Sequence, residues 1–358
     1  MRNLNGTVFL PSISKNNNFN IVRLIAALQV AFSHGAHHLD VILGPSFLFV
    51  SYLPAVPAFF GISGFLITNA YCRNPNLKKY IRNRALRLYP GLWVCLLLTV
   101  VLLLVFQVID FSTIASLSFI RWIFCQATFF QFYTPDYLRG WGVGTPNGSL
   151  WTISVELQFY IFLPVYILVM KNVRKIFFIM ISALLFLASW KTGLILENMG
   201  ESTLAGKLLH VSLAPYLHYF FLGVWSFFLW DSIKGSFENR FYLWLLVYVG
   251  YILIFRVLLN WYQPSYYPGI LAWIANCLQW CMVLSFAFTH PSLSYTILKE
   301  NDISYGLYIY HMVIVNCMLS ISLPFSPQIK LMVMLLTTIL VAFLSWRYIE
   351  MPALRQKK

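Results

Sequence analysis

The sequence has few charged residues and no long polar stretch. Asp, Glu, Lys and Arg make up only 10% of its 358 residues, whereas a soluble domain has about 25%. This composition excludes a soluble domain of useful size. With 59% hydrophobic residues gathered in runs of helical length, the chain is predicted to be a polytopic membrane protein. Segments of about ten residues with alternating hydrophobicity, the pattern of a membrane barrel, are absent from the sequence.

The sequence also lacks the patterns of a disulfide framework, a metal site and a cleaved signal peptide. Its six cysteines lie mostly inside apolar runs, and Cys277 and Cys281 have no His or second Cys pair nearby. No A-x-A-like cleavage site follows the first apolar run, which we therefore interpret as a retained span. The net charge of +14 comes from basic residues in short loops beside apolar runs. That distribution indicates membrane orientation and argues against nucleic-acid binding.

The predicted fold class is all-α, a bundle of ten transmembrane helices. With the N-terminus in the cytoplasm, nineteen of the 25 Lys and Arg residues lie on the cytoplasmic side, so the positive-inside rule predicts that both termini are cytoplasmic. The predicted parts are a cytoplasmic leader (1–19), a transmembrane domain (20–350) and a basic cytoplasmic tail (351–358). The ten predicted spans are residues 20–40, 47–71, 88–109, 150–170, 175–196, 208–230, 240–260, 267–289, 302–321 and 328–349.

A long outer loop, residues 110–149, interrupts the pattern of short connections. Its apolar part, Phe119 to Tyr133, is predicted to form a re-entrant or an interfacial helix, and a run rich in Gly and Pro follows it. Loops of this length in a compact body tend to be functional. No inverted repeat relates the two halves of the chain, which weakens a transporter interpretation.

Two polar groups share one face of the first span. Arg23 and His34 are eleven residues apart, which is three helical turns plus about 20°, with an axial separation of about 16 Å. Glu156 lies about two turns inside the outer end of the fourth span, on one face with Thr152 and Tyr160. Polar groups at such depth usually face a protein-lined cavity. We expect Glu156 to meet His34 and to orient its imidazole, or else to form a structural buried ion pair.

A cluster of cations precedes the third span, in the sequence KKYIRNRALRLYP of residues 78–90. Arg84 and Arg87 are three residues apart and therefore neighbours on a helix, and two guanidinium forks suit the oxygens of a phosphate. The alternative is that these cations only set the membrane topology and contact anionic lipid.

A stripe of small residues follows one face of the second span, at Gly61, Gly64 and Thr68. The stripe predicts either tight packing against another helix or a surface for a thin acyl or pantetheine chain. Ser63 lies beside it but lacks the strand–turn–helix setting of a nucleophile elbow. In the ninth span, Ser304, Tyr308 and His311 share one face. They are expected to face the bundle interior, and for His311 alone we favour a hydrogen bond to a neighbouring helix.

Six sequence blocks, in order from Phe19 to Pro352, together resemble the acyltransferase family 3 of bacterial membrane proteins, which includes O-acetyltransferases of O-antigen and exopolysaccharide. Asn83 stands where the family commonly has the first of two arginines, which leaves open which arginines form the phosphate clamp. The blocks are R-x-x-A-A-x-x-V-x-x-x-H from Arg23 to His34, FFGISGFLIT, RALRLYP, LWTISVELQFY, ISYGLYIYH and YIEMP.

The resemblance implies a multi-pass protein of the bacterial inner membrane that uses acetyl-CoA or another acyl-CoA as donor, with no tightly bound cofactor and no metal. The acceptor would be a hydroxyl of a cell-surface polysaccharide, such as O-antigen, or of its polyprenyl-linked oligosaccharide precursor. Larger relatives carry an additional periplasmic domain, so this chain is expected to pass the acyl group to its acceptor directly. Membrane lipid is an expected partner, and homo-oligomers are possible.

The resemblance also assigns roles to the residues singled out above. The expected catalytic residues are His34 and Glu156, with His34 as general base. The expected acyl-CoA contacts are Arg23, Arg82, Arg84, Arg87, Ser63 and Gly64, and the expected acceptor contacts are Tyr160, Ser304, Tyr305, Tyr308 and His311. Two other functions remain open: a transporter or flippase of a lipid-linked sugar, and an acyltransferase for a small lipid or antibiotic-like acceptor.

Overall fold

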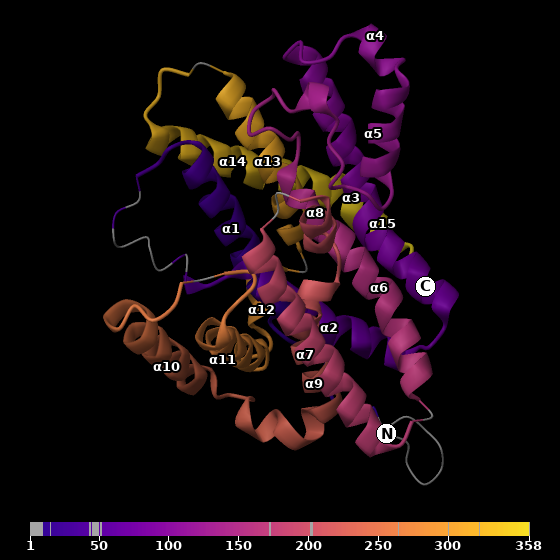
Figure 1. The fold of residues 1–358 in the computed structure, drawn as a ribbon, viewed down its shortest axis with the longest axis vertical. Coiled ribbons are helices and arrows are strands. Elements are labelled where there is room, and N and C mark those ends of the chain that lie inside the picture. Colours follow the sequence, from indigo (N-terminus) through magenta and orange to yellow (C-terminus); the bar gives the residue numbers. More distant parts are fainter. Residues whose placement is uncertain are drawn as a thin grey trace. The chain divides into compact units, whose positions relative to one another are not determined.

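A computed structural model shows an all-helical protein, which confirms the predicted fold class (Figure 1). The chain forms two compact units, and each is described by itself. Unit 1 consists of Met1–Ala26, Ser51–Tyr80 and Val155–Glu300, and unit 2 consists of Ala27–Val50, Ile81–Ser154 and Asn301–Lys358. The structure describes residues 10–14, 16–42, 44, 50, 52–171, 173–200, 203–263, 265–299, 301–321 and 323–357.

Unit 1 is built around the contact between α2 and α9, with α7 packed on α9 and α10 packed on α11. Its core is rich in aromatic rings; Phe65, for example, contacts Phe19, Phe227 and Trp230. The helices of this unit are the start of α1 (Phe19–His38), α2 (Ala55–Arg73), most of α6 (Trp151–Met170), α7 (Lys175–Met199), α8 (Leu204–His210), η4 (Ala214–Tyr216), α9 (Leu217–Ile233), η5 (Lys234–Ser236), α10 (Phe241–Tyr251), η6 (Ile252–Leu258), α11 (Ile270–Ala287) and α12 (Leu293–Leu298).

Unit 2 is organised around α13, which packs along α14. Gly306 permits this close approach, because a Cβ there would lie only 3.0 Å from the backbone of Ala342. The helices of this unit are the rest of α1, most of α3 (Leu77–Val105), α4 (Phe111–Ile114), α5 (Leu117–Ala127), η2 (Asp136–Leu138), η3 (Gly148–Leu150), the first residues of α6, α13 (Ser304–Ser320), α14 (Pro327–Ser345), η7 (Trp346–Glu350) and α15 (Met351–Arg355).

The described residues contain eight helices that are long and apolar enough to cross a membrane, or nine if the bent pair Leu204–His210 and Ala214–Ser236 is one span. That bent pair corresponds to the expected span 208–230. The expected span 302–321 is α13, which has only 17 residues and rises about 26 Å, less than the bilayer core of about 30 Å. Thirteen of its 17 residues, 304–316, are buried, so protein surrounds most of this helix. The start of the expected span 47–71 lies partly outside the described residues, and α2 begins at Ala55.

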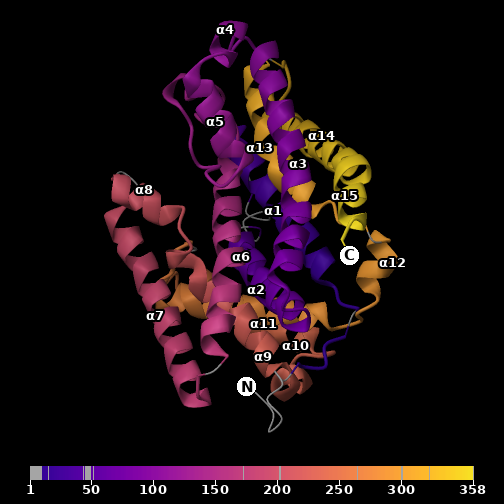
Figure 2. The ribbon, with the colours of Figure 1, turned by 90° about the vertical axis from the view of Figure 1, so that its right-hand side faces the viewer.

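The apolar part of the loop 110–149 forms a helix, α5, which runs back along α3 (Figure 2). The Trp93 indole donates a hydrogen bond to the Ala127 carbonyl at 2.9 Å, and the Tyr89 hydroxyl donates to the Thr128 carbonyl at 2.9 Å. Since Trp93 precedes the end of α3 by twelve residues, the end of α5 lies about 18 Å back along that helix. The helix therefore packs along α3, and its re-entrant or interfacial position in the membrane stays a prediction.

The Gly- and Pro-rich end of the same loop is held by one buried amide. Asn316, on α13, accepts a hydrogen bond from the Val143 backbone at 2.9 Å and donates to the Thr145 carbonyl at 2.9 Å. Gly142 has a positive φ of 56°, and a Cβ on it would collide with Asn316. The loop therefore depends on a glycine at this position both for its backbone angle and for its close approach to α13.

The small-residue stripe of α2 packs against α9, as one of the two alternatives predicted. A Cβ on Gly64 would collide with the Phe220 carbonyl oxygen, and a Cβ on Gly223 would collide with the Gly61 carbonyl oxygen. The backbone of α9 occupies the side of Gly64 where a Cβ would lie, and the contact of Gly64 with a pantetheine chain stays a prediction.

We expect Gly64→Ala to destabilise the protein, because the added methyl group must push the backbones of α2 and α9 apart. Overpacking of this kind costs about 1–3 kcal/mol. The matched control is Gly250→Ala in α10, where a Cβ meets nothing within 4 Å and the helix gains propensity. The measurement is the thermal unfolding midpoint in detergent. Equal midpoints for the two variants would show that the α2–α9 contact tolerates a methyl group.

Candidate active site

His34 lies next to a second histidine, His311, in unit 2. The His34 Nδ1 atom is 3.0 Å from His311 Nε2, and the two ring centroids are 5.1 Å apart. His34 is partly buried on α1, whereas His311 is completely buried on α13. Gly35, beside His34, allows α14 to approach, because a Cβ there would collide with Met334. The two rings thus meet where α1 lies beside α13.

The backbone fixes which nitrogen of His34 is available for chemistry. His311 Nδ1 is 2.7 Å from the Tyr308 carbonyl oxygen, and a carbonyl can only accept, so Nδ1 must carry the hydrogen. In a neutral pair His311 Nε2 is then bare and accepts the hydrogen of His34 Nδ1. The lone pair of His34 is therefore on Nε2. An imidazole with this tautomer can take a proton from a hydroxyl group.

The Tyr308 side chain anchors α13 to the start of α6. Its hydroxyl is 2.7 Å from Thr152 Oγ1 and donates to the Ser149 carbonyl at 3.2 Å. Ser149 in turn donates to the Tyr308 carbonyl oxygen at 3.2 Å, the same atom that accepts from His311. These bonds fix the carbonyl group that determines the His311 tautomer.

Glu156 belongs to a separate polar cluster in unit 1. Its Oε1 accepts a hydrogen bond from the Tyr160 hydroxyl at 2.5 Å and a longer one from Ser63 Oγ at 3.4 Å. Glu156 and Tyr160 therefore share a helix face, as their spacing predicted, and a short hydrogen bond joins them. Since His34 falls in unit 2 and Glu156 in unit 1, the expected pairing of the two stays a prediction.

The arginines expected to bind phosphate are held differently from one another. Arg87 forms an ion pair with Asp302 at 2.5 Å, with both side chains mostly buried, and its guanidinium lies 5.9 Å from the centre of the Tyr305 ring. An anion at Arg87 would have to compete with this carboxylate. Arg82, by contrast, is exposed and donates to the Gln356 carbonyl at 3.2 Å.

Arg84 is partly buried on α3, and Arg23 is partly buried on the unit 1 segment of α1. The role of all four arginines in binding acyl-CoA stays a prediction.

The residues expected to contact the acceptor from α13 are buried and bonded within unit 2. Ser304 Oγ donates to Asp302 Oδ1 at 2.5 Å, and the Tyr305 hydroxyl donates to the Leu88 carbonyl at 2.8 Å. Their contact with an acceptor stays a prediction. The ion pair of Asp302 with Arg87 is not predicted from the sequence, although Asp302 directly precedes the polar stripe of the ninth span. The contact between His311 and His34 is not predicted either, because no spacing along the chain relates two residues on different helices.

Comparisons with known proteins identify the family of this chain. A family model described as an acyltransferase domain matches residues 16–347. The chain belongs to this acyltransferase family. The match confirms the resemblance found in the six sequence blocks, and it makes the protein an acyltransferase with several membrane-spanning helices. Within the described ranges, no group of three His, Cys, Asp or Glu side chains is placed to hold a metal ion.

Three relatives show the range of the similarity. The chain is 29% identical to nodulation protein 10 of Rhizobium leguminosarum bv. viciae, over 96% of its own length and 95% of the relative's. It is 24% identical to the peptidoglycan O-acetyltransferase OatA of Listeria monocytogenes, over 83% of its length and 50% of the relative's. It is 31% identical to the O-acetyl transferase of Shigella phage Sf6, over 51% and 55%. The chain thus spans about half of the last two relatives. No solved structure matches it significantly.

We expect acyl transfer to depend on the hydrogen bond that His311 accepts from His34. His311→Leu removes the acceptor and should lower kcat about ten- to a hundredfold, less than the loss of a general base itself, which costs about 10²–10⁴-fold. His311→Gln places an amide oxygen near the position of Nε2 and should restore part of the rate.

The measurement is the rate of acyl transfer, with thermal unfolding as the control for folding. A His311→Gln variant no more active than His311→Leu, at equal stability, would contradict the role of this hydrogen bond.

Proposed function

We propose that the protein is a membrane O-acetyltransferase. It moves an acetyl group from acetyl-CoA to a hydroxyl of a cell-surface polysaccharide, or of the polyprenyl-linked precursor, at the bacterial inner membrane. The observation that carries the proposal is the His34–His311 pair, which leaves a lone pair on His34 Nε2 in a chain of an acyltransferase family. The names of two relatives, a peptidoglycan O-acetyltransferase and an O-acetyl transferase, support the O-acetyl chemistry.

In the proposed reaction His34 acts as general base and then as general acid. Its Nε2 takes the proton of the acceptor hydroxyl as that oxygen attacks the thioester carbonyl. The carbon–oxygen bond forms, the carbon–sulfur bond breaks, and the thiolate of CoA receives the proton from His34. His311 accepts the hydrogen bond of His34 Nδ1 throughout, so the ring does not have to reorient between the two proton transfers. The same base would serve a relay through an acyl-enzyme.

Glu156 is proposed as the second catalytic group, as the sequence predicts. The Tyr160 and Ser63 hydroxyls both donate to its Oε1 and hold the carboxylate in place. A carboxylate held in this way can stabilise positive charge that develops on an imidazole. Glu156→Gln, which keeps the shape and removes the charge, is the substitution that isolates this role.

The phosphates of CoA are proposed to bind at the cytoplasmic end of α3, where Arg82 and Arg84 lie one turn before Arg87. Guanidinium groups suit phosphate because their planar fork matches two oxygens. We keep the predicted donor contacts at Arg84 and Arg87, with Arg82 or Arg23 assisting, and an anion at Arg87 would compete with Asp302. This placement rests on the orientation predicted by the positive-inside rule.

Mass spectrometry of surface glycans tests the proposed function directly. Glycans from cells with the protein should carry O-acetyl groups that are missing without it, and His34→Ala should abolish them while the protein remains in the membrane. The matched control is His37→Ala, an exposed residue at the end of the same helix. Unchanged glycans, or full acetylation with His34→Ala, would overturn the proposal, and acetylated lipid or small molecules would redirect it to another acceptor.

Donor binding gives a separate expectation. Purified protein should retain radiolabelled acetyl-CoA, and Arg84→Ala should weaken retention about tenfold or more, because a hydrogen bond between two charged groups is lost. The matched control is Arg121→Ala, an exposed arginine on α5. Equal retention by wild type and Arg84→Ala would remove this arginine from the donor site.

A further inference from the structure

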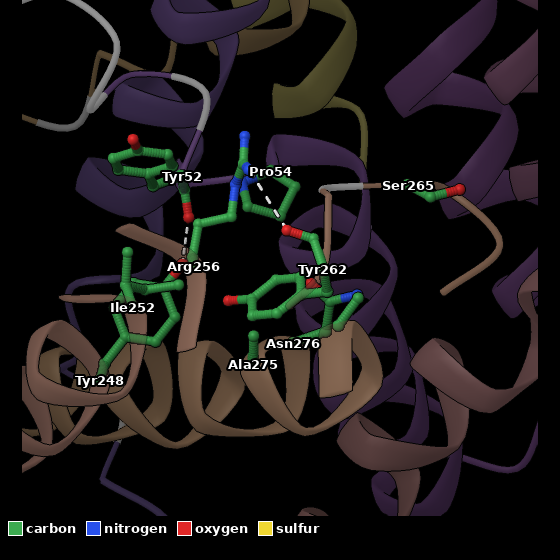
Figure 3. Close-up of a pocket in the computed structure, with 10 residues that line it drawn as sticks. Tyr52, Pro54, Tyr248, Ile252, Arg256, Tyr262, Ser265, Ala275 and Asn276 are labelled. Carbon is green, nitrogen blue, oxygen red and sulfur yellow. Dashed lines mark hydrogen bonds between the residues drawn. The ribbon is translucent and has the colours of Figure 1, made fainter. Parts of the chain in front are cut away.

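Unit 1 contains a cavity that the reaction above does not use (Figure 3). It lies where η6, which continues α10, meets α11 and the residues just before α2, and it has a volume of about 310 Å³ that includes open solvent. Its enclosed part has a volume of about 20 Å³, enough for about one water molecule, and the rest is open to solvent. Its polar lining comes from Tyr52, Tyr248, Arg256, Tyr262, Ser265 and Asn276.

The cavity contains an arginine without an acidic partner. Arg256 Nη1 donates to the Tyr262 carbonyl at 3.2 Å and to Asn260 Oδ1 at 3.4 Å, and the guanidinium lies 5.6 Å from the centre of the Tyr52 ring. In the part of the chain that the structure describes, no carboxylate forms an ion pair with it. Arg256 sits in the π-helical segment η6, a conformation that is rare and frequently marks functional sites.

Two hydrogen-bond donors in the cavity are buried without an acceptor. Arg256 Nε and the Tyr262 hydroxyl have no hydrogen-bond partner among the described residues. Leaving such a group unsatisfied costs about 1–3 kcal/mol, so the arrangement is better suited to a bound acceptor than to an empty cavity. Burial raises the pKa of Tyr262 to about 12, which keeps its hydroxyl protonated and able to donate.

The orientation of Arg256 selects the kind of ligand. Its Nη1 is engaged by the protein, whereas Nε and Nη2 form the edge with which arginine binds carboxylate or phosphate through two parallel hydrogen bonds. Asn276 donates through Nδ2 to the Tyr219 hydroxyl at 3.0 Å, which leaves its carbonyl oxygen to accept from a sugar hydroxyl. Ser265 bonds to Glu197 at 3.1 Å, so this end of the cavity is already satisfied.

We propose that this cavity binds an oxyanion carried by the acceptor saccharide, with Arg256 and Tyr262 as donors. The inference rests on the proposed function, because it assigns the ligand as the acceptor. The oxyanion has two sources: the carboxylate of a sugar acid, or the phosphate that links the glycan to its polyprenyl carrier. The positive-inside rule predicts that the cavity faces the outer side, where the acceptor is expected.

The test measures binding of defined probes to the full-length protein in lipid nanodiscs. The probes are a glucuronic-acid disaccharide, its uncharged methyl ester, and a prenyl diphosphate linked to one sugar. We expect at least one of the two charged probes to bind, and the ester to bind about tenfold more weakly than the acid or not at all. Binding of the acid identifies a sugar carboxylate, and binding of the diphosphate identifies the lipid linkage.

Two substitutions of Arg256 distinguish the paired hydrogen bonds of its planar guanidinium from its positive charge. Arg256→Gln should weaken binding of the charged probe about tenfold or more, Arg256→Lys by less, and Tyr262→Phe severalfold. Arg121→Gln, the matched control, should leave binding unchanged. In acyl transfer, Arg256→Gln should raise the KM for the acceptor more than it lowers kcat.

The binding readout does not depend on catalysis. His34→Ala should bind the probes like the wild type, so a failure of the proposed reaction and a failure of this site give different results. Should the ester bind as tightly as the acid and the diphosphate not bind, or should Arg256→Gln, Arg256→Lys and Tyr262→Phe all bind like the wild type, the guanidinium serves only to hold the Tyr262 carbonyl and the proposal is wrong.

Discussion

A polar side chain inside a bilayer must find its hydrogen-bond partner in the protein, because lipid provides none. This requirement shapes both units. In unit 2 it pairs His34 with His311, Arg87 with Asp302, and the Asn316 amide with three groups of the loop before α6. In unit 1 it gives Glu156 the hydroxyls of Tyr160 and Ser63. Close contacts between helices also occur at glycines, as at Gly64 between α2 and α9 and at Gly306 between α13 and α14.

The same requirement distinguishes groups that hold the fold from groups available to a ligand. His311, Tyr308 and Asn316 are buried and bonded inside unit 2, and they fix the tautomer of His34 and the course of the loop before α6. Arg256 Nε and the Tyr262 hydroxyl are buried without acceptors among the described residues. In the proposed complex, an oxyanion of the acceptor accepts hydrogen bonds from these two donors.

Helix length adds a second consequence. α13 is shorter than the bilayer core and is mostly surrounded by protein, and α5 folds back along α3 instead of crossing. The polar groups Ser304, Tyr308 and His311 of α13 therefore lie against protein.

The sequence by itself determined the class of fold, most of the spans and the family, because hydrophobic runs and six ordered blocks are local properties of the chain. It also predicted that Glu156 and Tyr160 share a helix face, since that follows from a spacing of four residues. Only the tertiary structure decided that α9 packs on the Gly64 surface, that His311 orients His34, and that Arg256 has no acidic partner among the described residues. These facts depend on contacts between helices distant in sequence, and such contacts leave no periodic signal along the chain.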